Sequence, residues 1–548
     1  MATTASSSRL NNKQRFRFIP LQPDAKAYLQ RLVDLSGAPQ ASFHVELDGQ
    51  AQAATLVRGQ HEMLPADRSR SSQPSPRPAE RTSARPGDRS ALTVPKDTDA
   101  IVYSVGSLTK IFINLAFYIA VSSGQYASLG LSWEKSACDM FNERRDYHKR
   151  SRIKKISRDP TIRELLLHRN GFAPMNHELF APDGTFIMSE ADFLEIAPRV
   201  TEAHFKGQMR GFSVYSNANH IFAGLLLEEI MGISLSEAMK KLVFGPLEMW
   251  HTVMDAASLQ CLSAEGDTVA RGHRVSGQMK VSALQPNHNY LKDKVEAASL
   301  GAYSSTEDIA KLFREFMKAL DNKSEIFSEE DALDFFGPNC DYHDGGKVSL
   351  AGLFGDANSS LPGSESLQTT LVPGPHTFDH RIGKMSNGSP CKLYYKAGSI
   401  DGYTATLYIS LRHRMFVIVL ANCSGPVDVT EHIARYILQE TLNLAPRINV
   451  EQDAWATSVR SCKKLSSLEQ VEQADLSWQD SIDQFVGDAG FGIDSWSVWS
   501  DRDFVIQNRD DGIYLVNRSG SGLPSQHQKA HPPPRAGSLG TKMDHVIG

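Results

Sequence analysis

The chain has 548 residues, enough for about two to four domains. Its hydrophobic content of 41% and charged content of 22% are close to globular averages, which excludes a chain that is disordered or fibrous throughout. The formal net charge of -5 is spread along the sequence, so composition predicts neither a nucleic-acid nor a membrane partner.

The N-terminus and the cysteines indicate the cellular compartment. Residues 1–9 are polar and lack the apolar stretch of a secretory signal, and no apolar run in the sequence reaches membrane-spanning length. The six cysteines are scattered without a Cys-x-x-Cys pair, which is typical of reduced thiols and argues against a zinc site or a disulfide framework. The sequence therefore predicts a cytoplasmic protein.

The first hundred residues predict a short tail, a helix and a hairpin. Residues 1–23 are predicted as a flexible tail, and residues 24–36 as an amphipathic helix. Alternating residues 41–47 and 53–58, joined by an Asp-Gly turn, predict two paired strands. Residues 63–92 are rich in Ser, Pro and Arg and are predicted to be a disordered insertion.

The next segment, Ser104-Val-Gly-Ser-Leu-Thr-Lys110, leads into a long apolar helix predicted over 111–124. Ser107 and Lys110 are three residues apart and share a helix face. A serine needs a neighbouring base to become a nucleophile, and a lysine can be that base where burial or nearby positive charge keeps its amine neutral. Backbone N–H groups of the first helical turn are available for a developing oxyanion.

Residues 160–171 predict a second helix. Thr161 and Glu164 have the spacing of a capping box at its start, and Gly171 is expected to end it. His168 fits a helix-end histidine that is bonded to the backbone.

A second polar motif, Tyr215-Ser-Asn217, precedes an apolar helix predicted over 221–232. Tyr215 is either part of an active site or a packed aromatic residue. Asn217 has a similar alternative, because asparagine is also a favoured N-cap residue and could simply begin the helix.

The last part of the main domain predicts three strands, 392–396, 403–411 and 415–422, followed by a helix over 428–444. If the first hairpin pairs with these strands, the two ends of the domain close one antiparallel sheet. Lys396-Ala-Gly-Ser399 is the third motif and begins in the first of these strands.

The remaining residues change in character. Residues 446–522 are predicted as a small β-rich appendage, with a hairpin formed by 503–508 and 513–517. Residues 523–548 are predicted as a disordered tail.

Together, Ser107-Leu-Thr-Lys110, Tyr215-Ser-Asn217 and Lys396-Ala-Gly-Ser399 resemble, in order and spacing, the serine β-lactamase and penicillin-binding-protein superfamily. The resemblance covers residues 24–445 and is nearest to class C β-lactamases and their esterase and transesterase relatives. It implies an α/β (α+β) fold of the β-lactamase/transpeptidase type. In this fold an antiparallel sheet is flanked by helices, a mostly helical lobe lies beside it, and the active site lies between them.

The resemblance also implies roles for individual residues. Ser107 would be the nucleophile that forms an acyl-enzyme, Lys110 would activate it, and Tyr215 would share the base role and protonate the leaving group. A phenol can do this only if adjacent cations lower its pKa, which two lysines could provide.

Four further residues would serve the substrate and the oxyanion. Asn217 would hold the lysine or the substrate, and Lys396 would add positive charge. Gly398 would let the substrate approach the backbone, and the N–H groups of Ser107 and Ser399 would form the oxyanion hole. No metal and no organic cofactor is implied.

Departures from the pattern direct the functional prediction. Ala397 stands where β-lactamases carry a threonine whose hydroxyl recognises a substrate carboxylate. We therefore expect a hydrolase or acyltransferase acting on a small-molecule ester, thioester or amide in natural-product metabolism, with an acyl donor and, for transfer, an acyl acceptor as partners. The alternatives are a true β-lactamase or peptidase and a catalytically silent binding protein on the same scaffold.

Overall fold

The computed structural model describes most of residues 21–459 and three later strands. The described residues are 21–59, 101–145, 151–179, 186, 188–205, 215–264, 268–284, 295–341, 347–351, 354–355, 393–459, 462, 504–509, 512–517 and 528–530. The insertion predicted over 63–92 lies outside them, as does most of each predicted tail.

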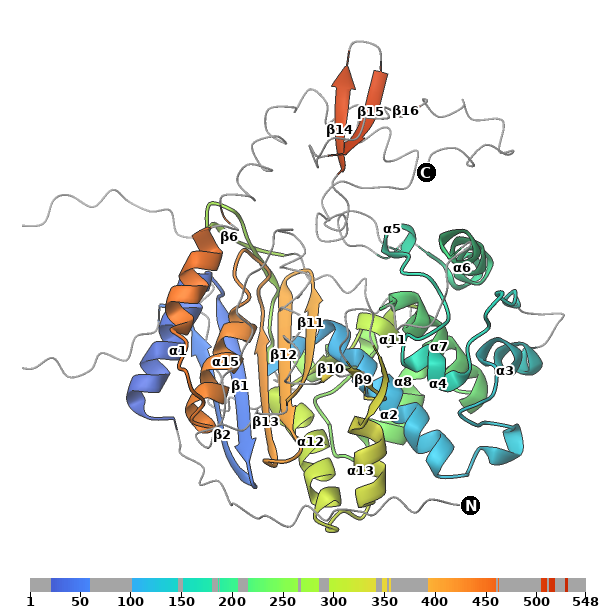
Figure 1. Cartoon of the computed structure of the whole chain (residues 1–548), viewed down its shortest axis with the longest axis horizontal. Coiled ribbons are helices and arrows are strands. Elements are labelled where there is room, and N and C mark those ends of the chain that lie inside the picture. Colours follow the sequence, from blue (N-terminus) through green and yellow to red (C-terminus); the bar gives the residue numbers. More distant parts are fainter. Residues whose placement is uncertain are drawn as a thin grey trace, which may run out of the picture.

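The main sheet has eight strands in the order β2-β1-β13-β12-β11-β10-β9-β8 (Figure 1). From one edge of the sheet to the other, the strands are β2 Gln50–Val57, β1 Gln40–Leu47, β13 Met415–Ala421, β12 Tyr403–Ser410, β11 Tyr394–Ile400, β10 Phe354–Gly355, β9 Lys347–Ser349 and β8 Pro338–Asp341. All neighbours pair antiparallel. Because β1 pairs with β13, the predicted closure of one sheet by distant parts of the chain is confirmed.

The main sheet separates two hydrophobic cores, because successive side chains along each strand point to opposite faces. On β13, alternate side chains enter opposite cores, with Phe416, Ile418 and Leu420 in the first and Val417, Val419 and Ala421 in the second. The first core lies toward the helical lobe, and the second lies under α1 Pro23–Ser36 and α15 Val429–Thr441 (Figure 1). Both faces of the sheet are therefore covered.

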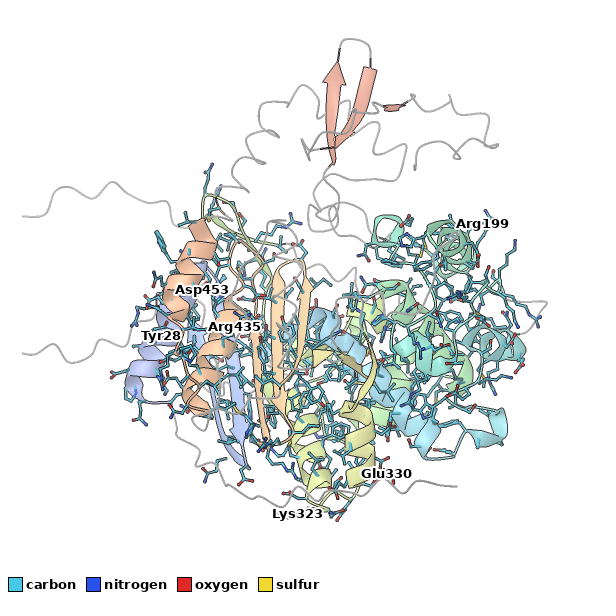
Figure 2. All side chains as sticks on the ribbon, viewed as in Figure 1. Tyr28, Arg199, Lys323, Glu330, Arg435 and Asp453 are labelled. Carbon is cyan, nitrogen blue, oxygen red and sulfur yellow. The ribbon has the colours of Figure 1, made fainter. Side chains whose placement is uncertain are left out.

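The outer layer is formed by α1 and α15. Figure 2 shows Tyr28 on α1 and Arg435 on α15, and the rings of Tyr28 and Tyr436 stack with centroids 4.1 Å apart. Residues 450–459 are also helical, and their Val450 and Ala454 belong to the second core. The core therefore extends past the boundary predicted at residue 445.

The helical lobe surrounds α2, which is mostly apolar and buried along most of its length, as expected for a central helix. The lobe and its connections contain α2 Thr109–Ser122, α3 Ala137–Arg144, α4 Ile162–Leu166, α5 Asn176–Leu179, α6 Glu190–His204, α7 Asn217–Met231, α8 Leu235–Met239, α9 Ala256–Ala264, α11 Ala297–Leu300, α12 Thr306–Leu320 and α13 Glu329–Phe336, with the short 3-10 helices η2 Gly106–Leu108 and η3 Ala127–Leu129 and the π-helix η4 Lys240–Phe244. Within the described residues, no helix combines the length and apolarity needed to span a bilayer.

Smaller strands complete the structure. β3 Ile101–Ser104 pairs with β4 Thr268–Val269 and β7 Tyr303–Ser304, and β5 His273–Val275 pairs with β6 Val281–Ala283. The hairpin predicted near the C-terminus is present as β14 Phe504–Arg509 and β15 Gly512–Asn517. A third strand, β16 Gln528–Ala530, pairs with β15 and lies within the stretch 523–548 predicted as a tail.

The helix predicted over 160–171 is shorter than expected. Its capping box is confirmed, because Thr161 Oγ1 accepts from the Glu164 N–H at 3.2 Å and Glu164 Oε2 accepts from the Thr161 N–H at 3.1 Å. Gly171 does not end the helix, since α4 ends at Leu166. His168 follows with a φ of 55°, so the chain leaves the helix earlier than the glycine indicates.

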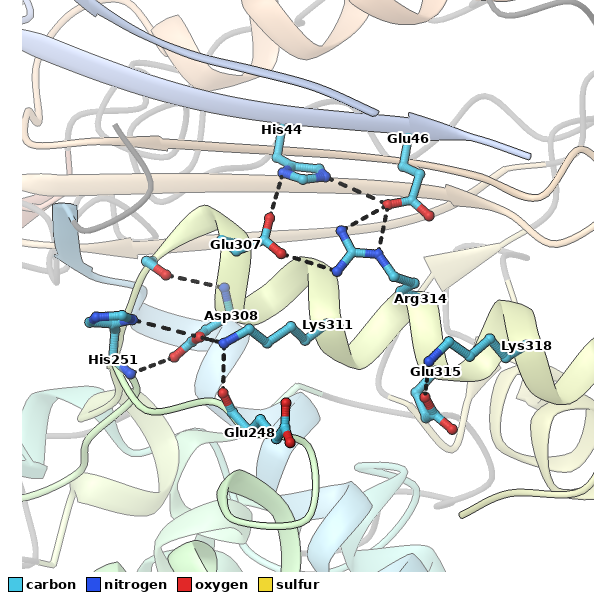
Figure 3. A network of polar contacts seen from close by, with 11 residues as sticks. His44, Glu46, Glu248, His251, Glu307, Asp308, Lys311, Arg314, Glu315 and Lys318 are labelled. Atoms are coloured by element: carbon cyan, nitrogen blue, oxygen red, sulfur yellow. Dashed lines mark hydrogen bonds and ion pairs between the residues drawn. The ribbon is translucent and has the colours of Figure 1, made fainter. Parts of the chain in front are cut away.

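A polar network joins the sheet to α12, and its two members on the sheet, His44 and Glu46, are buried (Figure 3). Arg314 bridges Glu46 of β1 and Glu307 of α12 at 3.0 Å each, and His44 Nδ1 lies 3.3 Å from Glu307. Only good geometry offsets the desolvation of such buried charges, and here each carboxylate has two cationic or imidazole neighbours. The network therefore ties α12 to β1 of the main sheet.

Candidate active site

Ser107 lies in η2, the tight turn between β3 and α2. The Val105 N–H donates to the Ala302 carbonyl at 3.0 Å. The Thr109 hydroxyl donates to the Gly106 carbonyl at 2.6 Å and accepts from the Ala302 N–H at 3.0 Å. The turn is therefore held from both ends, and its Ser107 is 6% exposed.

Lys110 is fully buried and has three oxygen neighbours. Its Nζ lies 3.2 Å from Ser107 Oγ, 2.8 Å from Asn217 Oδ1 and 2.8 Å from the Ser299 carbonyl oxygen. Burial, together with the positive charge of Lys396, holds the pKa of Lys110 well below its ordinary value. The predicted proximity of Ser107 and Lys110 is therefore confirmed, although Ser107 precedes the α-helix.

Tyr215 approaches Ser107 from the other side. Its phenolic O–H donates to Ser107 Oγ at 2.7 Å. The Nζ atoms of Lys110 and Lys396 lie 5.0 Å and 4.9 Å from the centroid of its ring, within cation–π distance. Tyr215 thus belongs to the site and is not a packed core aromatic.

Asn217 begins α7 but does not cap it, because Ser216 occupies the N-cap position. The Asn217 amide joins two polar neighbours: Oδ1 accepts from Lys110 at 2.8 Å and Nδ2 donates to Asn176 Oδ1 at 2.9 Å. The alternative interpretation of Asn217 as a helix cap is wrong.

Asn176 and the Ser299 carbonyl were not predicted. Asn176 lies in the four-residue helix α5, outside any motif, and a backbone carbonyl carries no residue-type signal. The Ser299 carbonyl contacts Lys110, and Asn176 contacts Asn217, and both contacts arise from tertiary packing.

β11 carries the third motif and alternates its side chains between the two cores. Lys396 is 2% exposed and lies beside Tyr215, and burial lowers its pKa to about 7. Ala397 packs instead against the second core. Ala397, which stands where β-lactamases carry a threonine, therefore faces the outer helices.

Gly398 is required by the protein backbone itself. A Cβ built on Gly398 would lie 2.1 Å from the Val105 carbonyl oxygen and 3.2 Å from the Ser107 nitrogen. Gly106 makes the reciprocal approach, because its Cβ would lie 2.9 Å from the Ser399 nitrogen. The two glycines let β11 and η2 pack main chain against main chain, which is a structural requirement for Gly398 beside its predicted role toward substrate.

The seven predicted site residues therefore converge on one place: Ser107, Lys110, Tyr215, Asn217, Lys396, Gly398 and Ser399. Ser399 is 7% exposed, and its main chain lies against the turn that carries Ser107. The arrangement places a hydroxyl between an amine and a phenol.

A sequence model of the Beta-lactamase family matches residues 95–441, which is more than half of the chain and includes all seven site residues. The chain therefore belongs to this family. Family and fold together indicate a serine hydrolase-like enzyme.

Three solved structures are similar to this chain to different extents. The octameric penicillin-binding protein homologue from Pyrococcus abyssi is similar with a TM-score of 0.52 at 16% identity, covering 91% of this chain and 88% of that chain. The Beta-Lactamase/D-Alanine Carboxypeptidase from Pseudomonas syringae has a TM-score of 0.47 at 16% identity, with 76% and 97% covered. A class C beta lactamase from Rhodobacter sphaeroides has a TM-score of 0.47 at 15% identity, with 82% and 100% covered. The first of these supports the β-lactamase/transpeptidase fold.

Proposed function

We propose that the protein is a serine hydrolase or acyltransferase that acts on a small-molecule ester, thioester or amide through an acyl-enzyme on Ser107. One observation carries this proposal: Ser107 Oγ lies within hydrogen-bond distance of both Lys110 Nζ, at 3.2 Å, and the Tyr215 O–H, at 2.7 Å. A serine in contact with two candidate bases has the arrangement that nucleophilic catalysis requires.

The neighbours of Lys110 support its role as the base. Asn217 Oδ1 and the Ser299 carbonyl oxygen can only accept hydrogen bonds, so they engage two N–H bonds of Nζ. A neutral amine has two N–H bonds and one lone pair, and with both bonds engaged its lone pair is left for Ser107 Oγ. Because burial and the charge of Lys396 hold the pKa of Lys110 well below its ordinary value, this neutral form is more accessible than it is for an exposed lysine.

The protons balance over one cycle. As Ser107 Oγ bonds to the substrate carbonyl carbon, its proton moves to Lys110. The bond to the leaving atom then breaks as Tyr215 gives its phenolic proton to the leaving group. Water, or an acceptor alcohol or amine, gives a proton to Tyr215 as it attacks the acyl carbon. The bond between Ser107 Oγ and that carbon then breaks, Lys110 returns its proton to Ser107, and the acid or the transfer product leaves.

The oxyanion of each tetrahedral intermediate is assigned to the N–H groups of Ser107 and Ser399. The close approach of β11 to η2 at Gly106 and Gly398 supports this assignment, because it brings the two backbone segments together. Preorganised N–H donors of this kind contribute roughly 3–4 kcal/mol each to transition-state stabilisation.

The test is intact-protein mass after mixing with an activated ester, a thioester and a β-lactam. We expect an added acyl mass that maps to Ser107 and is absent in Ser107→Ala. Faster loss of this mass on adding an alcohol or amine identifies an acyltransferase, and loss to water alone identifies a hydrolase. If no donor labels the folded protein, the proposal fails and a silent binding protein is favoured. A role in natural-product metabolism is supported only by the resemblance of the three motifs to acyltransferases of this superfamily. Adding the alcohol or amine tests whether acyl transfer occurs.

We expect a bell-shaped pH dependence of the acylation rate. It rises from acid pH as Lys110 loses its proton, and it falls through about pH 7 as Lys396 loses the charge that stabilises developing negative charge. Lys396→Gln removes the alkaline limb. It also moves the acid limb to higher pH, because Lys110 loses the positive neighbour that lowers its pKa. Single-turnover acylation between about pH 5 and 9 checks both shifts, and an unchanged alkaline limb in the variant would contradict the assignment.

A further inference from the structure

His168 lies beside the site but belongs to none of its three motifs. It follows α4, is 4% exposed and has a φ of 55°. Its Nδ1 accepts from the Ser216 N–H at 3.1 Å, so the expected backbone contact of this histidine is confirmed. Ser216 stands between Tyr215 and Asn217 in the sequence. The hydrogen bond from its N–H to His168 therefore limits the movement of the backbone that carries both residues.

The protonation of His168 follows from its surroundings. An Nδ1 that accepts a hydrogen bond leaves the ring proton on Nε2. A charged imidazolium would have a proton on Nδ1 and could not accept from Ser216. Burial holds the pKa of His168 well below its ordinary value, and the neighbouring Lys396 and, whenever it is protonated, Lys110 lower it further, which favours the neutral acceptor.

A second histidine connects His168 to the core. The two imidazole rings have centroids 4.8 Å apart, and His220 Nε2 lies 2.8 Å from Asn114 Oδ1. Asn114 Nδ2 donates to the Leu350 carbonyl at 2.9 Å. The oxygen of Asn114 is therefore directed to His220, which anchors the histidine pair to the buried helix α2.

His168 also contacts Tyr215 directly. The ring centroids of His168 and Tyr215 are 4.7 Å apart with the planes tilted by 40°. The residue thus holds the Tyr215 ring by packing and the following peptide by a hydrogen bond. Ser216 Oγ adds a second tie by donating to the Ala173 carbonyl at 3.0 Å.

We propose that His168 is a positioning residue: by accepting the Ser216 N–H and packing on the Tyr215 ring, it aligns the phenol with Ser107 and the Asn217 amide with Lys110. This inference rests on the proposed function, because alignment matters only if Ser107 is acylated. His168 itself contacts neither Ser107 nor the reacting atoms among the described contacts.

The positive φ of His168 suggests a matched pair of variants. Asparagine and glycine both tolerate left-handed backbone, and neither has an imidazole ring. The asparagine Oδ1 can replace Nδ1 as an acceptor, whereas glycine cannot. His168→Asn and His168→Gly therefore differ chiefly in the hydrogen bond to Ser216.

We expect His168→Gly to lower the single-turnover acylation rate about tenfold or more, with KM nearly unchanged, because displaced catalytic groups lose alignment. His168→Asn should restore the rate to within about threefold of the wild-type value. Asn443→Gly replaces another left-handed residue, with a φ of 48° at the far end of α15, and should leave the rate unchanged. Equal rates in the glycine and asparagine variants, per folded molecule, would overturn the proposal.

A second measurement does not depend on activity. Deuterium exchange of the peptide that contains Ser216 should be faster in His168→Gly and close to wild type in His168→Asn. Equal exchange in both variants would also overturn the positioning role. If the wild-type protein is not acylated by any donor while the exchange pattern appears as expected, the proposed function fails and the tie between His168 and Ser216 stands.

Discussion

Replacing Lys110 by methionine is expected to lower the acylation rate of Ser107 about a thousandfold, which corresponds to about 4 kcal/mol of transition-state stabilisation. Methionine has a similar length and is apolar, so it fills the buried position without a base. Tyr215 still contacts Ser107 Oγ at 2.7 Å, and it is the second group that could take the proton. The size of the loss therefore measures how the base role divides between the two residues.

The measurement is single-turnover acylation by an activated ester, followed by intact-protein mass. Lys318→Met is the matched control, because Lys318 is a half-exposed lysine on α12 that pairs with Glu315 on the same helix. The control should react at the wild-type rate. A Lys110→Met protein that reacts within about tenfold of wild type would assign the base role to Tyr215.

The same variant has opposing effects on stability. Removing a buried lysine relieves the desolvation that lowers its pKa. The Asn217 and Ser299 oxygens lose their donor, at about 1–3 kcal/mol for each unsatisfied group. We therefore expect the variant to remain folded, so that the lost rate reports chemistry.

The sheet could be predicted because its signal is local and repeated. Alternation along 41–47 and 415–422 identifies strands, and β1 does pair with β13. The Thr161 cap of α4 was equally predictable, since its signal spans only four residues. The same local signals misplaced the helix end at Gly171, because His168, which accepts a hydrogen bond from the distant Ser216, already leaves the helical conformation with a φ of 55°.

The site was predictable where a residue type carries the chemistry. Ser107, Lys110 and Tyr215 stand in motifs, and they converge. Asn176 and the Ser299 carbonyl could not be identified, because their contacts depend on the packing of short segments against α7 and α2. Ala397 shows a further limit, since only the strand register reveals that it packs against the second core.

Gly398→Ala is expected to damage both rate and stability. The added methyl group would lie 2.1 Å from the Val105 carbonyl oxygen and 3.1 Å from the Leu108 nitrogen. Those neighbours are backbone atoms, so they cannot yield as a flexible side chain would. β11 must therefore move away from η2, which separates the Ser107 and Ser399 amides.

We expect the acylation rate of Gly398→Ala to fall about a hundredfold, as for a misplacement of about 1 Å. Its free energy of unfolding should fall by about 1–3 kcal/mol through overpacking. Thermal unfolding and single-turnover acylation, corrected for the folded fraction, separate the two losses. A folded Gly398→Ala protein with the wild-type rate would show that the spacing of β11 and η2 does not set the reaction.

Gly49→Ala provides the comparison that isolates this spacing. Gly49 lies in the turn between β1 and β2 with a φ of 81°, and a Cβ there has no heavy atom within 4 Å. The alanine therefore adds backbone strain of about 1–2 kcal/mol and no clash. The control is expected to lose a similar amount of stability and to keep the wild-type acylation rate. A large rate loss in Gly398→Ala alone would then be due to the displaced Ser107 and Ser399 amides and not to a weaker fold.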